Sequence, residues 1–74
     1  MTAELTDNEK MNMINQHIKT CVSNRYNLQL SLIAENAVPS PNQDTIDNIN
    51  TQIARENARQ TALEAEAATL TIVA

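Results

Sequence analysis

The sequence predicts an all-α protein: an antiparallel two-helix hairpin, coiled-coil-like, that assembles into a multi-helix bundle by oligomerisation. Three observations lead to this prediction. Both prolines, Pro39 and Pro41, lie near the middle of the chain, and glycine is absent from it. On either side of the prolines, apolar residues recur at alternating steps of three and four, the spacing of a buried helical seam. The second half also carries a stripe of small residues with the same steps.

A single domain covering residues 1–74 is expected, and it needs additional support to be stable. A chain of this length buries only about 60% of the surface that its unfolded form exposes. Its only cysteine, Cys21, has no partner for an internal disulfide, and its only aromatic residue, Tyr26, cannot build a large core. Small scaffolds gain stability from disulfides, metals or partner subunits. Oligomerisation is therefore the expected source of stability.

The first helix is expected over about residues 6–36. The segment from Thr6 to Glu9 reads TDNE, which has the form of a capping box because each of these two side chains can bond the backbone of the other. Val38 precedes a proline and is pushed away from helical geometry. The helix should therefore end near Asn36.

The turn is expected over residues 37–40 and the second helix over about residues 41–70, with an apolar tail at 71–74. Ser40 and Pro41 have the form of an N-cap and a first helical residue, since proline at that position loses no hydrogen bond. Gln43 follows Ser40 by three residues and can complete a second capping box. Two helices of similar length joined by a short link form an antiparallel hairpin.

The apolar steps predict which residues meet between the two helices. Val22 and Ile33 are expected to widen this hairpin seam. Arg25 and Glu56 interrupt it and should lie about one helical turn apart. They could form a half-buried pair that fixes the register or an ion pair at the solvent edge. The predicted hairpin seam consists of Met11, Ile14, Ile18, Cys21, Leu28, Leu32, Ile46, Ile49, Ile53, Leu63 and Leu70.

The stripe of small residues in the second helix predicts an oligomer interface. It lies more than about 100° around the helix from the seam, so two sides of this helix are suited to contact. Small side chains let helices approach closely, and the simplest partner is another copy of the chain. The alternative is that the alanines face water and serve helix propensity alone. The predicted stripe consists of Ala54, Ala58, Thr61, Ala65, Ala68 and Ile72.

Two residues of the first helix form a further candidate partner contact. Tyr26 and Leu30 lie off the seam, on adjacent turns of one helical face. Residues four apart in a helix are neighbours on its surface. Together they make a modest apolar contact site.

Residues suited to chemistry are sparse. His17 lies one turn before Cys21, but a zinc site needs three or four ligands and the chain offers no second pair. A Cys–His nucleophile would lack a third group and an oxyanion site, and a chain without glycine has no phosphate-cradling loop. We therefore expect no catalytic, cofactor-binding or metal-binding residues, and no enzymatic activity.

Charge and hydropathy restrict the expected partners and location. The net charge is −4 and the five basic residues are scattered, which argues against nucleic-acid binding. No apolar run approaches the roughly 18 residues that cross a bilayer, and the first residues lack the pattern of a secretory signal. A soluble, cytoplasmic protein is expected, or a virion protein if it is viral, with protein as its partner.

Two classes of function remain open. In its richness in Asn, Gln and Thr and its alanine seam, the chain resembles in style accessory or structural proteins of bacteriophage particles. The favoured hypothesis is a structural or assembly protein, a helical hairpin that self-associates as a scaffold or connector, with a bacteriophage virion as one setting. The competing hypothesis is a small inhibitor or adaptor that binds a host protein through a helical face or its C-terminal tail.

Overall fold

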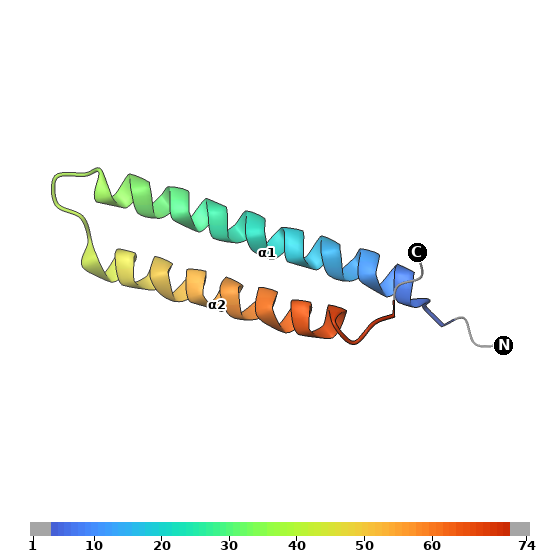
Figure 1. The fold of residues 1–74 in the computed structure, drawn as a ribbon. Helices are drawn as coiled ribbons and strands as arrows, with labels where there is room; N and C mark the ends of the chain where they lie inside the picture. Colours follow the sequence, from blue (N-terminus) through green and yellow to red (C-terminus); the bar gives the residue numbers. More distant parts are fainter. Residues whose placement is uncertain (1–3, 72–74) are drawn as a thin grey trace.

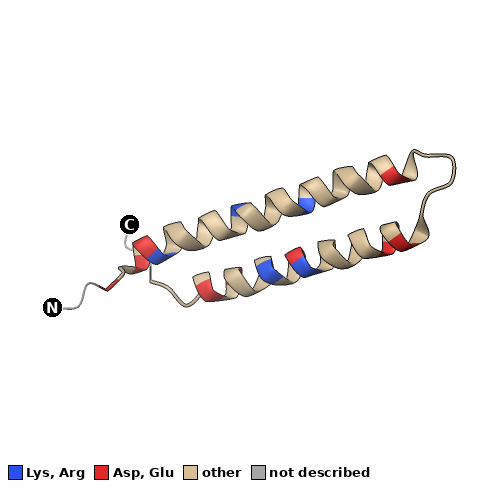
Figure 2. Ribbon diagram, turned by 180° about the vertical axis from the view of Figure 1, so that it is seen from behind, with Lys and Arg blue, Asp and Glu red and all other residues tan. Residues whose placement is uncertain are grey.

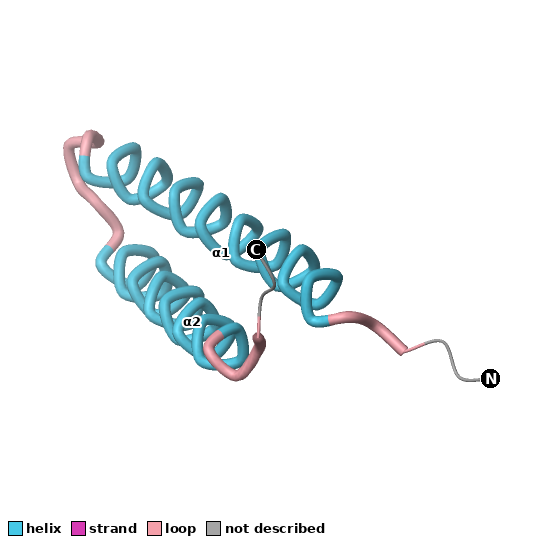
Figure 3. Tube along the Cα trace, turned by 45° about the vertical axis from the view of Figure 1, so that its right-hand side comes forward, coloured by secondary structure: helices cyan, strands magenta, loops and turns pink. Residues whose placement is uncertain are grey.

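The computed structural model describes residues 4–71 and confirms the helical hairpin (Figure 1). Helix α1 spans Asp7–Asn36 and helix α2 spans Gln43–Ala67. The two helices lie side by side and antiparallel, and they pack against each other. Figure 3 shows the same pair from another direction, with loop at the turn and at the ends of the described chain.

Helix α1 begins with the predicted capping box. The Thr6 N–H donates to Glu9 Oε1 at 2.9 Å, and the Glu9 N–H donates to Thr6 Oγ1 at 3.1 Å. Hydrogen bonding of the Glu9 carboxylate with the Thr6 backbone, and next with the Thr6 side chain, lowers the pKa of Glu9. The contribution of ionised Glu9 to stability is therefore present above the ordinary glutamate pKa. It is lost as the pH falls through the lowered pKa.

The start of α2 differs from the sequence prediction. Asn42, not Ser40, is the N-cap, and its side chain accepts a hydrogen bond from the Thr45 N–H at 3.1 Å. The Asn42 N–H donates in turn to Glu35 Oε2 in the last turn of α1, at 2.9 Å. Asparagine caps a helix as well as serine does. Because Glu35 holds the backbone at Asn42, α2 starts at Gln43 and Pro41 remains in the turn.

The end of α2 also comes earlier than predicted, at Ala67 instead of residue 70. The Thr69 and Leu70 N–H groups donate to carbonyls three residues back, at 3.0 and 3.1 Å, which closes the helix with a tight turn. The Thr69 hydroxyl also donates to the Glu66 carbonyl at 2.7 Å. A threonine that bonds the backbone locally competes with continuation of the helix.

The last described residue is tied back to the first helix. The Thr71 N–H donates to Asp7 Oδ2 at 2.8 Å, across a separation of 64 residues. Of the predicted tail at 71–74, residues 72–74 lie outside the described residues. The Asp7–Thr71 bond therefore joins the two ends of the described chain at the open end of the hairpin.

The hairpin is a thin rod with a narrow interior. Its extents are 61 × 24 × 14 Å, and its radius of gyration is 17.3 Å. A compact protein of this length would have a radius of gyration of about 11 Å. Within residues 4–71, the side chains exposed by less than a tenth are those of Ile14, Cys21, Ile49 and Glu56. Neither described helix has the length and apolar character of a transmembrane span.

Candidate functional site

The hairpin seam lies along the contact between α1 and α2. Ile14, Cys21 and Ile49 are buried, with exposed fractions of 6–8%. The other residues of the seam are half-buried: Met11, Ile18, Leu28, Leu32, Ile46, Ile53, Leu63 and Leu70. The steps of three and four therefore coincide with the covered side of each helix.

Two residues expected to widen the seam do not contribute to it. Val22 is 39% exposed and Ile33 is 66% exposed. At 100° per residue, both lie roughly 70–95° around α1 from the mean direction of the seam. A hairpin gives α1 only one neighbouring helix, so side chains at that angle remain in solvent.

The predicted Arg25–Glu56 pairing is also wrong. One guanidinium nitrogen of Arg25 donates to Asn57 Oδ1 and to Gln60 Oε1, each at 2.7 Å. Glu56 instead pairs with Arg59, one turn further along α2, at 2.7 Å. An i,i+3 partner on the same helix is already within reach of the carboxylate. The amide oxygens, whose role the sequence reasoning missed, then satisfy Arg25 across the interface.

Beside the contacts of Arg25, Glu56 is buried and faces Cys21 across the seam. Glu56 is only 7% exposed, and its Oε1 atom has no hydrogen-bond partner. Burial, and next the negative charge of Glu56, raise the pKa of the Cys21 thiol. At neutral pH Cys21 therefore stays protonated, a form that is a poor nucleophile and metal ligand.

Replacing Arg59 by methionine should lower the free energy of unfolding by about 1–3 kcal/mol, because the Glu56 carboxylate would stay buried without its ionic partner. Replacing Glu56 by leucine removes the group that needs Arg59 and should be neutral or stabilising by about 1 kcal/mol. Urea unfolding followed by circular dichroism measures both. The control is Arg55→Met, on an exposed arginine, and equal losses at Arg55 and Arg59 would contradict the prediction.

The predicted oligomer stripe is open to solvent in the hairpin. Its described members, which are Ala54, Ala58, Thr61, Ala65 and Ala68, are all exposed. Ile72, the sixth, lies outside the described residues. On α1, Tyr26 is 60% and Leu30 is 45% exposed. The hairpin itself covers neither of these surfaces.

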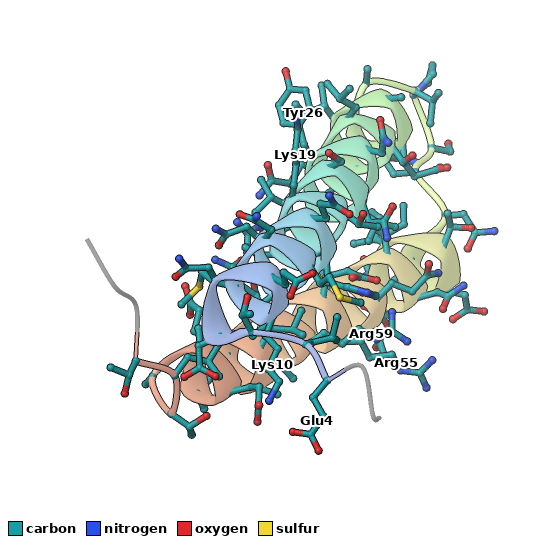
Figure 4. All side chains as sticks on the ribbon, turned by 90° about the vertical axis from the view of Figure 1, so that its right-hand side faces the viewer. Glu4, Lys10, Lys19, Tyr26, Arg55 and Arg59 are labelled. Atoms are coloured by element: carbon teal, nitrogen blue, oxygen red, sulfur yellow. The ribbon has the colours of Figure 1, made fainter. Side chains whose placement is uncertain are left out.

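Both surfaces open to the same side of the hairpin. At 100° per residue, the centre of the stripe lies about 140° around α2 from the seam, and Tyr26 lies about 110° around α1 from the seam. Both angles are measured in the direction in which the helix turns as residue number increases. Because the helices are right-handed and antiparallel, these equal senses of rotation lead to one side. Figure 4 shows Tyr26 and Lys19 projecting together from α1, away from Arg55 and Arg59 of α2.

Two shallow hollows follow the other side of the hairpin. One, of about 320 Å³, is lined by Asn24, Asn27, Leu28, Ser31, Gln52 and Glu56. The second, of about 250 Å³, is lined by Leu5, Lys10, Met13, Ile14, His17 and Glu66. His17 is exposed there, and within residues 4–71 no three side chains gather that could hold a metal ion.

The candidate functional features of the chain are therefore its exposed surfaces: the stripe of small residues on α2 and the apolar residues Tyr26 and Leu30 on α1. Comparison of the chain with protein-family models, with curated proteins and with solved structures finds no match.

Proposed function

We propose that the chain is a non-enzymatic structural or assembly protein, a helical hairpin that self-associates and serves as a scaffold or connector. The observation that carries the proposal is the area of unpartnered surface. A compact folded protein of this mass has an accessible surface of about 4,500 Å², whereas the hairpin has 5606 Å². The excess of about 1,000 Å² is similar to the roughly 800 Å² that each partner buries in a stable interface.

The exposed stripe of α2 supports the same proposal. A helix whose second side carries mostly small side chains is suited to close approach by another helix. The stripe shares its side of the hairpin with exposed apolar residues of α1, so one partner could cover both. Asparagine, a poor helix former, is frequent in both helices, so they depend on packing for their stability. Self-association would supply that packing, in a virion or in the cytoplasm.

Sedimentation of the purified chain over a range of concentrations tests the proposal. A discrete multimer that dissociates on dilution is the expected result, with helix content and thermal midpoint falling together with the mass. A folded monomer with a concentration-independent thermal midpoint would overturn self-association. It would favour the competing proposal, an inhibitor or adaptor that binds one partner through a helical face.

A further inference from the structure

The exposed apolar residues of α1 form one continuous face. Val22, Tyr26, Leu30 and Ile33 are exposed by 39–66%. At 100° per residue they fall within about 80° of one another around the helix. We call these four residues the Tyr26 face. Their side chains carry more apolar surface than the alanines of α2, with which they share one side of the hairpin.

The Tyr26 face has an internal symmetry. Val22 and Leu30 lie four residues before and after Tyr26, and about 40° to either side of it around the helix. An interface with two-fold symmetry requires that residue i contacts residue j while j contacts i. A two-fold axis beside Tyr26 meets this condition, because it brings Val22 of one copy opposite Leu30 of the other and Tyr26 opposite itself.

The charge of the chain is divided along the hairpin in a way that selects the orientation. Residues 10–25 contain Lys10, Lys19 and Arg25 and no acidic residue, a net charge of +3. Residues 26–54 contain Glu35, Asp44 and Asp47 and no basic residue, a net charge of −3.

Figure 2 shows acidic residues toward the turn and also at the opposite end of the hairpin, with most basic residues along the middle of the two helices. Residues 55–71 lie beside residues 10–25 and add −1, from Arg55 and Arg59 against three glutamates, so these two segments together carry +2. Glu4, Asp7 and Glu9 add −3 at the open end of the hairpin.

In two antiparallel copies centred at Tyr26, residues 16–25 of one copy, which contain Lys19 and Arg25 and no acidic residue, lie along residues 27–36 and the acidic turn half of the other. The acidic open end of each copy extends beyond the turn of its partner. Parallel copies would lay like charges together, which is unfavourable within the roughly 10 Å range of screened interactions.

We propose that the Tyr26 face binds a second copy of this chain in antiparallel orientation, with the two-fold axis beside Tyr26. This inference rests on the proposed self-association and adds the face and the orientation to it. The Arg25 network with Asn57 and Gln60 would border the contact. The hollows on the opposite side would stay open in the dimer.

Single cysteines can test the geometry, in a Cys21→Ala background that is first checked for parental helix content and mass. A chain carrying Val22→Cys is mixed with a chain carrying Leu30→Cys, and the mixture is oxidised gently. A disulfide needs Cβ atoms about 3.5–4.5 Å apart. The mixture should therefore give a bridged dimer on a non-reducing gel, whereas Val22→Cys or Leu30→Cys alone should not.

Two further single-cysteine variants complete the set. Tyr26→Cys should bridge to itself. Asn27→Cys, which is exposed and about 100° around α1 from Tyr26, is the matched control that should remain monomeric on the gel. Bridging of Val22→Cys by itself, without bridging in the mixture, would show parallel copies and overturn the inference. Equal bridging by Asn27→Cys would show random collision and overturn it as well.

A further test uses a variant that keeps the native Cys21, so it remains informative if Cys21→Ala does not fold. Tyr26→Glu should raise the dissociation constant of the multimer at least about tenfold, measured by sedimentation beside Asn27→Glu, which should leave it unchanged. If the parent chain is a monomer, the proposed function itself fails. If the parent is a multimer but Tyr26→Glu behaves like Asn27→Glu, the function stands and only the Tyr26 face is wrong.

Discussion

Replacing Ile49 by alanine should lower the free energy of unfolding by about 2–5 kcal/mol, the range for large-to-small changes at buried positions. Ile49 is 8% exposed and is one of three buried apolar residues in the described chain. Removing its outer carbons loses transfer free energy and leaves a cavity, and a two-helix contact has no further layer that could close over it. Since small domains are only marginally stable, we expect most of the helix signal to disappear at 25 °C.

Chemical unfolding followed by circular dichroism, at one fixed protein concentration, measures this loss. Met13→Ala is the control, because Met13 is 48% exposed and lies on the side of α1 away from the Tyr26 face. That change deletes a side chain of similar volume and should stay within about 0.5 kcal/mol of the parent. If the two variants lost the same amount, Ile49 would not lie in the interior that the structure describes.

Introducing glutamate at Ala58 or Ala65 should break the multimer while leaving the hairpin seam intact. At a close contact between small residues, a longer side chain forces the helices apart. A carboxylate there also leaves water without gaining a partner, which costs several kcal/mol. In a symmetric assembly every subunit carries the change, so the cost recurs at each interface. Sedimentation beside the parent chain, with circular dichroism to verify the helices, gives the result.

Ala62→Glu is the matched control for this experiment. Ala62 is exposed on the same helix but lies about 80° from the centre of the stripe, and the substitution adds the same charge. It should change stability by no more than about 0.5 kcal/mol and leave the mass unaltered. Parental mass and thermal midpoint in Ala58→Glu and Ala65→Glu would mean that the stripe faces solvent. The single-partner adaptor would then be the better proposal.

The hairpin could be predicted from the sequence because its determinants are local. A proline restricts the residue before it whatever the rest of the chain does, and the Thr6–Glu9 capping box spans four neighbouring residues. The steps of the apolar residues likewise follow from helix geometry alone. These features give the fold and the approximate extent of α1 without knowledge of any tertiary contact.

The errors occurred where a distant or a competing partner decides. Ser40 and Asn42 are equally good caps in isolation, and the bond from Glu35 that favours Asn42 joins two different helices. From the sequence, either Arg25 or Arg59 could pair with Glu56. The side-chain conformations in the structure show that the partner is Arg59. The predicted surfaces for self-association depend on contacts with a second molecule, which no contact within one chain determines.

The hydrogen bond between Thr71 and Asp7 at the open end of the hairpin has a mechanical consequence. The chain enters and leaves the rod at the same end, since the Thr71 N–H is bonded to Asp7. A tensile force applied to the two ends would therefore peel α1 and α2 apart, loading one layer of the seam at a time, starting with this bond. Peeling loads the contacts of the seam one after another, whereas a shear along the length loads all of them at once, so peeling needs the lower force. A connector built from this hairpin would therefore withstand more tension when it is attached through the sides of its helices than when it is attached through its two chain ends.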